Sequence, residues 1–587
     1  MIRKCILAGF LLFVNGVILS QNYRYVNTVF PSSTATTNVI YGSAPFLNSP
    51  YYNESLTTTS NLVMDIYRPT GDAFTNRPAI IFVHGGGFVT GNRNHNDMVA
   101  FCDSFARKGY VTATIDYRQG VYTYTDAEMH YTRAVYRGTQ DGRTAVRFLR
   151  ANAATYGIDP TRIYLAGSSA GGFIALHDIY MDDPGEKPPY AGATTYGTFP
   201  PITAPDLGLY DIGNNLTYNG EPDAILSLWG AVASPDLITA DDTQPVFLVH
   251  GTADLIVPFD IGHPFQIPAF PLVYGSNQVN NKLNTLGLTG NMTYFVEGQG
   301  HEFYGVTNGM WNNGTGGNAY WDTIVRKTTE FFHGVHKPHA AFSFTVTGLT
   351  VNFTDQTPGA ASWQWTFGDA TTGTTQNPIH NFPAYGVYHV CLYVQNSIAS
   401  WDTLTQTVFL TTLPANRTVS NTIIHNNESS CYAATQAVTV SNVTVESGGD
   451  LTLIAGQSIH LNPGFLVNAG GNLLASITTT YSYCPGDVPL KGNPSGTPPS
   501  RRSPGESLGM QVYPNPTAGL FTLEVTGQDV PPEMQVTIFG IYGETVLQQS
   551  LAGKGCRQLS LGAVPSGVYL VRLRTPGETL YRRVIKL

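Results

Sequence analysis

The sequence predicts an α/β domain with a mainly parallel sheet, followed by modules built from β-strands alone. Over residues 21–335, short apolar runs alternate with helical patterns, and repeated strand–helix units form a parallel sheet covered on both faces. Beyond residue 338, apolar residues recur with a period of two, which indicates antiparallel strands. Only 12% of the 587 residues are charged, about half the usual share, so uncharged polar groups cover much of the surface.

Charge and length limit the classes of function. The net charge is −9 and no basic run occurs, so nucleic acid is not expected as a partner, because phosphate binding requires a basic face. A hydrophobic share of 42% supplies packed cores and excludes a disordered chain. At roughly 150 residues per domain, the length predicts about three to five domains.

Residues 1–20 have the layout of a secretory signal peptide. Arg3 and Lys4 precede an apolar run of about a dozen residues, and Ser20 stands before Gln21. The alternative, a membrane anchor, is disfavoured because the run is short for a span of ~20 residues. No Cys-x-x-Cys pair or His/Cys cluster suggests zinc.

The buried strands of the α/β domain read as continuous apolar runs, as strands covered on both faces should. They comprise residues 79–83, 111–115, 163–166, 225–229 and 246–249. The clearest helical pattern between them covers residues 141–150.

Ser169 is the predicted nucleophile. It is the central residue of Gly167-Ser-Ser-Ala-Gly171, which follows the strand at 163–166 and opens a helical pattern. A sharp strand-to-helix turn forces its central residue into a strained conformation and projects the hydroxyl, while the flanking glycines relieve crowding. This placement favours Ser169 over its neighbour Ser168.

A hydroxyl nucleophile needs a base that is held by an acid. Asp254 comes just past the strand at 246–249, and His301 follows the strand-like residues 292–296. Serine, acid and histidine then occur in the order typical of hydrolases. We therefore predict that Ser169, Asp254 and His301 act together. Asp260 is the alternative acid.

The loop after the first buried strand is predicted to stabilise an oxyanion. It reads His84-Gly-Gly-Gly-Phe88, and its glycines leave backbone N–H groups unshielded. We expect the N–H groups of Gly86 and Gly87, together with that of Ala170, to form the oxyanion hole. His84 is expected to shape the loop, and His250 to be a buried structural histidine.

Residues 60–335 resemble the α/β-hydrolase fold and, more narrowly, secreted carboxylesterases related to the hormone-sensitive lipase group. The resemblance rests on His84-Gly-Gly-Gly, Asp116-Tyr-Arg118, Ser168-Ser-Ala-Gly-Gly172, Gly251-Thr-Ala-Asp254 and Gly300-His301. It implies hydrolysis of carboxylic esters through a covalent acyl-enzyme, without a metal or an organic cofactor. The sequence departs from the group at Ser168, where aspartate is usual, which leaves the mechanism intact.

The expected substrate is a short-chain or aryl ester. An insertion at residues 178–223 follows the nucleophile helix and is expected to form a pocket wall, with the aromatic stretch 259–274 as the opposite rim. Both are mostly uncharged, which favours apolar or aromatic groups. Two alternatives stay open: an acetyl or feruloyl esterase acting on plant polysaccharide, and a lipase or polyester hydrolase.

Residues 338–411 resemble a PKD domain, an immunoglobulin-like sandwich. The resemblance rests on Trp363-Gln-Trp-Thr-Phe-Gly-Asp369 and on the strongly alternating residues 386–394. It implies a spacer or a weak binder of polysaccharide or protein, of which we favour the spacer.

Residues 412–484 form a predicted β-rich repeat module, and residues 485–510 a linker. Val445-Glu-Ser-Gly-Gly-Asp-Leu451 recurs as residues 467–473, and short strands broken by Gly-Gly turns at fixed spacing suggest a small β-solenoid. Cys431 and Cys484 flank this module and could pair in an oxidising compartment. The linker is rich in proline, glycine and serine.

Residues 511–587 resemble the C-terminal sorting domain of the type IX secretion system of Bacteroidetes. The resemblance rests on Tyr513-Pro-Asn-Pro516, Pro565-Ser-Gly-Val-Tyr569 and the basic last strand at 582–587. It implies the type IX machinery as a partner, export through the outer membrane, and a secreted or cell-surface location.

Overall fold

The computed structural model describes residues 24–198, 200–369, 371–478, 483–484, 509–513, 520–526, 534–540, 545–551, 555–561, 564–575 and 579–586. It divides into two units, residues 1–491 and 492–587, and the boundary falls within the predicted linker 485–510. The predicted signal peptide 1–20 lies outside the described residues, as do Phe199 and most of the linker.

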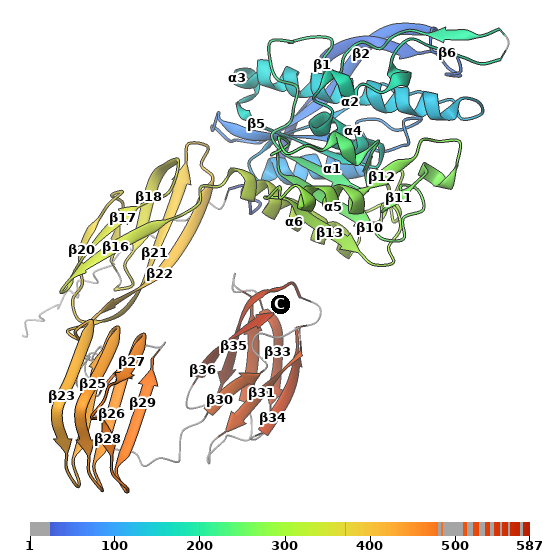
Figure 1. Ribbon diagram of the computed structural model, residues 1–587. Helices are drawn as coiled ribbons and strands as arrows, with labels where there is room; N and C mark the ends of the chain where they lie inside the picture. Colours follow the sequence, from blue (N-terminus) through green and yellow to red (C-terminus); the bar gives the residue numbers. More distant parts are fainter. Residues whose placement is uncertain are drawn as a thin grey trace, which may run out of the picture. The chain divides into compact units, whose positions relative to one another are not determined.

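An eight-stranded sheet with the order β1-β2-β4-β3-β5-β8-β10-β13 organises the first half of the chain (Figure 1). Every neighbouring pair from β4 to β13 is parallel, whereas β1 and β2 add an antiparallel edge that the sequence did not predict. The strands are β1 (Ser33–Leu47), β2 (Thr57–Pro69), β3 (Arg77–Val83), β4 (Val111–Ile115), β5 (Ile158–Ser168), β8 (Ile225–Leu228), β10 (Val246–Gly251) and β13 (Met292–Val296). The predicted fold class is confirmed.

Helices cover both faces of this sheet (Figure 1). They are α1 (Asn96–Arg107), α2 (Ala127–Ala151), α3 (Ala153–Tyr156), α4 (Ala170–Tyr180), α5 (Ser276–Thr285) and α6 (Ala319–His336). In β3, Ile81 packs into the core shared with α2, α4 and α5, while Ile80 and Phe82 pack into the core shared with α1 and α6. Because successive side chains of a strand enter opposite cores, β3 is apolar at every position from Pro78 to Val83. No helix among the described residues is both long and apolar enough to span a bilayer.

The insertion at residues 178–223 lies along α2. Arg133 donates to the backbone carbonyls of Tyr190 and Pro205, each at 2.7 Å, and Gln140 donates to those of Leu207 and Leu209. Further short strands in the connections of this domain are β6 (Thr194–Tyr196), β7 (Ile202–Ala204), β9 (Ala231–Val232), β11 (Ile261–Gly262), β12 (Val273–Gly275), β14 (Val306–Thr307) and β15 (Met310–Trp311).

Residues 342–410 form a β-sandwich of two antiparallel sheets, ordered β16-β17-β20 and β19-β18-β21-β22. Trp365 is fully buried in its core, and Trp363 is half-buried and donates from its indole nitrogen to Asp355 Oδ2 at 2.8 Å. The strands are β16 (Phe342–Thr347), β17 (Thr350–Asp355), β18 (Ala360–Thr366), β19 (Thr372–Gly373), β20 (Ile379–Asn381), β21 (Gly386–Asn396) and β22 (Trp401–Leu410).

The repeat module stacks its strands in parallel. Ser429 pairs with Asp450 and Asp450 pairs with Asn472, so each strand lies beside the one about a repeat further along the chain. A disulfide joins Cys431 to Cys484. The strands are β23 (Asn416–Ile424), β24 (Ser429–Ala434), β25 (Ala437–Val445), β26 (Asp450–Ala455), β27 (Ser458–Leu461), β28 (Leu466–Val467) and β29 (Asn472–Ile477).

The C-terminal unit has its own core. Its antiparallel sheets have the orders β30-β31-β34 and β33-β32-β35-β36, and Phe521, Val536 and Val571 are among the buried core residues. The strands are β30 (Gly509–Tyr513), β31 (Leu520–Thr526), β32 (Met534–Phe539), β33 (Thr545–Leu551), β34 (Gly555–Ser560), β35 (Gly567–Arg574) and β36 (Thr579–Lys586).

Glu54 is a buried charge that joins the β1–β2 connection to α2. Its carboxylate accepts from Arg133 at 2.8 Å, from Arg137 at 2.7 Å and from His130 at 3.0 Å. Burial alone would raise the pKa of Glu54, but the charge of Arg137 and the hydrogen bonds from His130 and Arg133 outweigh it and lower the pKa to about 2.

We predict that Glu54→Gln lowers the free energy of unfolding of this domain at pH 7 by about 3–5 kcal/mol, because two buried arginines lose their counter-charge. A carboxylate with a lowered folded pKa stabilises the fold above its unfolded pKa and loses this contribution as the pH falls. The difference from wild type should therefore shrink between the ordinary pKa of 4.5 and the folded pKa of about 2. Calorimetry of the full chain from pH 7 to pH 3 measures both effects.

The matched control is Glu330→Gln, which removes the exposed partner of Arg326 on α6. It should change the free energy of unfolding by less than about 0.5 kcal/mol. A difference for Glu54→Gln that grows toward pH 3 would contradict the prediction.

Candidate active site

Ser169 lies at the turn between β5 and α4 with φ +54° and ψ −114°. This backbone conformation is strained for a residue with a side chain. Gly167 and Gly171 make the turn sterically feasible, since a Cβ on Gly167 would lie 2.0 Å from the Gly171 carbonyl oxygen. A Cβ on Gly171 would likewise lie 2.2 Å from the Val83 carbonyl oxygen. The strained strand-to-helix turn with flanking glycines, predicted from the sequence, is thus present at Ser169.

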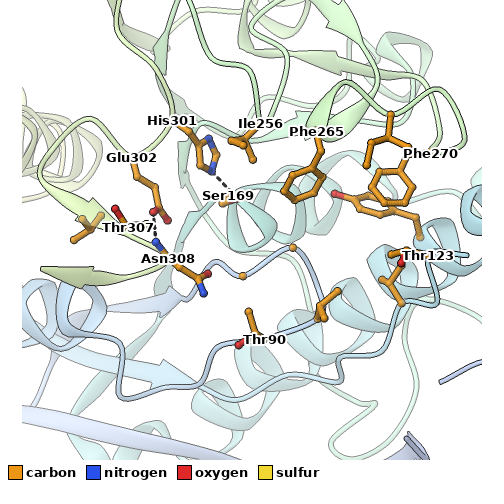
Figure 2. Close-up of a pocket in the computed structure, with 17 residues that line it drawn as sticks. Thr90, Thr123, Ser169, Ile256, Phe265, Phe270, His301, Glu302, Thr307 and Asn308 are labelled. Atoms are coloured by element: carbon orange, nitrogen blue, oxygen red, sulfur yellow. Dashed lines mark hydrogen bonds between the residues drawn. The ribbon is translucent and has the colours of Figure 1, made fainter. Parts of the chain in front are cut away.

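The structure brings Ser169, His301 and Asp254 together, and Figure 2 shows the contact between Ser169 and His301. Ser169 Oγ lies 2.9 Å from His301 Nε2, and Asp254 Oδ2 lies 2.7 Å from His301 Nδ1. An imidazole that carries its proton on Nδ1 donates to Asp254 and accepts from the Ser169 hydroxyl. The three residues follow β5, β10 and β13, whose carboxyl ends meet at one edge of the sheet.

Asp254 is held as an ionised acceptor. Its Oδ1 accepts from the backbone N–H groups of Ile256 at 2.8 Å and Val257 at 3.0 Å. Burial alone would raise the pKa of Asp254, but hydrogen bonds from His250 and His301 outweigh it and hold the pKa well below its usual value. Asp260, the alternative acid, is exposed and accepts from the side chains of Asn277 and Gln278.

The glycine loop lies beside Ser169. Gly86 and Gly87 have φ of +114° and +60° and line the same pocket as Ser169. Within the described part of the chain, neither N–H donates to a protein acceptor. Gly86 and Gly87 thus lie near Ser169, and Ala170 follows Ser169 directly in the chain.

His84 is buried behind this loop and shapes it. It stacks on Tyr117 with ring centroids 4.4 Å apart, and its Nδ1 lies 2.6 Å from the Gly85 carbonyl oxygen. Burial lowers the pKa of His84 to about 3, so the ring is neutral near pH 7. His250 is also buried, 3.3 Å from Asp254 Oδ2.

A pocket of about 680 Å³ opens beside Ser169 and His301. One side is apolar and includes Phe265, Ile267 and Phe270 from the predicted rim 259–274. Contrary to expectation, no described residue of the insertion 178–223 lines this pocket. The reason is the contact with α2, whose arginines and Gln140 bind the backbone carbonyls of the insertion and hold it along that helix.

Tyr131 and Glu302 are among the pocket residues that the sequence reasoning missed. Tyr131 comes from α2 and lines the apolar side, and nothing in its local sequence sets it apart. Glu302 follows His301 directly in the sequence, and this position could have marked it as a pocket residue. Its backbone φ is +50°. Its Oε2 accepts from the backbone N–H of Asn308 at 2.5 Å (Figure 2).

Buried hydrogen bonds fix the segment that carries His301. The Tyr304 hydroxyl donates to Asp97 Oδ2 at 2.6 Å, and this contact ties the segment to α1. Ser168 is fully buried, and its hydroxyl accepts from the indole N–H of Trp229 at 3.0 Å. Within the described ranges, no group of three or more His, Cys, Asp or Glu side chains is placed to hold a metal ion.

Three segments match known families. Residues 64–183 match the BD-FAE family, residues 337–411 the PKD domain, and residues 511–587 the secretion system C-terminal sorting domain. The BD-FAE segment contains the glycine loop and Ser169 and ends before Asp254 and His301.

Carboxylesterase NlhH of Mycobacterium tuberculosis is 32% identical over 182 residues, which cover 31% of this chain and 52% of that protein. Neuroligin-like protein glit-1 of Caenorhabditis elegans is 28% identical over 180 residues, which cover 29% of this chain and 23% of that protein. The chain thus spans about half or less of the length of these curated relatives. A structure of Thermogutta terrifontis esterase 2 aligns with 20% identity and a TM-score of 0.33, covering 51% of this chain and 96% of that one.

The chain therefore carries an esterase-type α/β-hydrolase domain in its N-terminal half, followed by a PKD domain and a C-terminal sorting domain that marks it for export to the cell surface or the medium.

Proposed function

We propose that this chain is an exported serine carboxylesterase that hydrolyses short-chain or aryl esters through an acyl-enzyme. The observation that carries the proposal is the continuous hydrogen-bonded contact from Ser169 Oγ through His301 to the buried Asp254. A serine with an oriented base activates its hydroxyl for attack on an acyl carbon. The match of residues 64–183 to an esterase family supports the same reaction class.

In the first half of the reaction, Ser169 Oγ attacks the ester carbonyl carbon while His301 Nε2 takes its proton. The N–H groups of Gly86, Gly87 and Ala170 donate to the oxygen that becomes negative. His301 then gives the proton to the departing alcohol oxygen, and the acyl group remains on Ser169.

In the second half, water repeats the attack. His301 Nε2 takes one proton of the water as its oxygen bonds to the acyl carbon, and the proton returns to Ser169 Oγ as the acid leaves. Asp254 stays ionised throughout and stabilises the imidazolium, for which its low pKa suits it.

The shape of the pocket supports an apolar acyl group. Phe265 and Phe270 lie on one side of Ser169 (Figure 2), and the Tyr131 ring packs against Phe270 with ring centroids 5.3 Å apart and ring planes tilted by 33°. Burying an alkyl or aryl group against these rings contributes about 25 cal/mol per Å² of apolar surface.

A second candidate is an esterase that acts on acylated polysaccharide. It is favoured by the other side of the pocket, where Glu302, Thr307 and Asn308 offer hydrogen-bonding groups. Release of acetate or ferulate from xylan faster than from simple esters would select this candidate.

We predict that Ser169→Ala lowers kcat for 4-nitrophenyl butyrate by a factor on the order of 10⁴ or more, because the reaction loses its nucleophile. Steady-state kinetics on the full chain measures the change, with an unshifted melting temperature as the control for folding. A variant that keeps a tenth of the wild-type rate would remove Ser169 from the mechanism.

We predict that Asp254→Asn lowers kcat by a factor on the order of 10³ to 10⁴, since a neutral amide neither fixes the imidazole tautomer nor stabilises its positive charge. The matched control is Asp260→Asn, which makes the same chemical change at an exposed site and should stay within about threefold of wild type. A larger loss of kcat in Asp260→Asn than in Asp254→Asn would show that Asp260 is the acid that holds His301.

We predict that Tyr131 limits the length of the acyl group. Its ring lines both the main pocket and a second cavity of about 40 Å³, which is bounded by Phe173, Pro188 and Leu272 among others. Tyr131→Ala should join the two spaces and raise the ratio of kcat/KM for octanoate over butyrate 4-nitrophenyl esters by about tenfold. This factor corresponds to the burial of about two further methylenes at about 0.8 kcal/mol each.

Tyr131→Phe keeps the ring and should keep the wild-type ratio, so it serves as the matched variant. An unchanged ratio in a folded Tyr131→Ala protein would show that another residue sets the limit.

A further inference from the structure

Glu302 is a buried carboxylate in the pocket that ester hydrolysis does not use. The proposed reaction already has its acid in Asp254, on the far side of His301. Glu302 is only 6% exposed and lines the pocket together with Ser169. Both Glu302 and Ser169 lie against Gly85: a Cβ on Gly85 would be 3.5 Å from Glu302 Oε1 and 3.2 Å from Ser169 Cβ. The carboxylate of Glu302 is therefore close to the proposed nucleophile Ser169.

The fold holds Glu302 at this place at a cost. Its φ of +50° is a conformation that side chains disfavour, and burial raises the pKa of the carboxyl group. Backbone N–H groups of Asn308 and Gly309 donate to it, but a neutral amide oxygen would serve them equally well. A buried charge that the loop does not need is a candidate for ligand binding.

Two neighbours of Glu302 on the pocket surface, Thr307 and Asn308, are polar and uncharged. Figure 2 shows Glu302, Thr307 and Asn308 on one side of the Ser169–His301 pair, and Phe265 and Phe270 on the other. An ionised carboxylate has about four acceptor positions, of which the two backbone N–H groups occupy only part. The remaining positions are available to a donor in the pocket.

The chemistry assigns the polar side to the alcohol half of the ester. His301 Nε2 must reach the departing alcohol oxygen in order to protonate it, so the alcohol half lies next to His301. Glu302 adjoins His301 in the chain and lies on the side of Thr307 and Asn308. The acyl half then occupies the apolar side.

We propose that Glu302 is a specificity-determining residue that accepts a hydrogen bond from a hydroxyl group on the alcohol half of the substrate. Esters of polyols and sugars carry such a hydroxyl beside the ester oxygen. The neutral side chains of Thr307 and Asn308 suit further hydroxyl groups better than a cation. This inference rests on the proposed esterase function.

The test compares two butyrate esters of nearly equal shape, 2-hydroxyethyl butyrate and propyl butyrate, which differ by a hydroxyl in place of a methyl group. Wild type should prefer the hydroxyl ester in kcat/KM. Glu302→Gln should lower this preference at least threefold and Glu302→Ala at least tenfold, because hydrogen bonds to charged acceptors are the stronger ones. Glu297→Gln changes an exposed residue close by in the chain and should keep the wild-type preference.

Three results would overturn the inference. If both Glu302 variants lower kcat/KM equally for the two esters, the carboxylate only supports its loop. If wild type shows no preference, the polar side does not bind the hydroxyl. If a choline ester of butyrate outcompetes the hydroxyethyl ester and loses that advantage in Glu302→Gln, the subsite binds a cation.

Failure of the proposed function looks different. Wild type would then hydrolyse neither these esters nor 4-nitrophenyl butyrate.

Discussion

The close approach of Gly167 to Gly171 determines the geometry of the catalytic domain. A Cβ on Gly167 would lie only 2.0 Å from the Gly171 carbonyl oxygen, and a Cβ on Gly171 only 2.2 Å from the Val83 carbonyl oxygen. The turn from β5 into α4 therefore requires glycine at both positions. Ser169 between them takes a strained backbone conformation, and that strain persists because β5 lies between β3 and β8 with both faces buried. The position of one hydroxyl group is thus maintained by the packing of the whole sheet.

Parallel topology brings the other groups to the same place. Val83 pairs with Gly167, and Gly251 pairs with Val296. The glycine loop follows β3, Asp254 follows β10 and His301 follows β13, so all three leave the sheet at its carboxyl edge. Residues that are far apart in sequence thereby become neighbours at the carboxyl edge, the usual ligand site of such sheets. Hydrogen bonds then fix the orientation of the Asp254 carboxylate, and the Tyr304–Asp97 contact fixes the segment that carries His301.

The sequence was informative where a pattern has one physical meaning. A run such as Ile80 to Val83 must be buried on both sides, and Gly167 to Gly171 permits few other turns. The sequence did not predict the position of a segment that is held by residues far away in the chain. The insertion 178–223 looked like a pocket wall, but arginines of α2 bind its carbonyls and draw it elsewhere. Tyr131 enters the pocket from the middle of a helix whose local pattern is that of any buried face. The antiparallel edge strand β1 is polar at many positions, so its sequence lacks a strong strand signal.

The anchoring of the insertion also affects how this protein can diverge. Arg133, Tyr136 and Gln140 bind the insertion through backbone carbonyl oxygens of Tyr190, Pro205, Leu207, Gly208 and Leu209. Every amino acid supplies such an oxygen, so side chains at these five positions can be exchanged without losing these hydrogen bonds. Asp211, in contrast, binds Arg143 and Arg147 of α2 through its side-chain carboxylate. Pro188, which borders the small second cavity, also lies in the insertion. Substitutions there can therefore reshape the far end of the apolar region while Ser169, Asp254, His301 and the sheet that supports them stay the same.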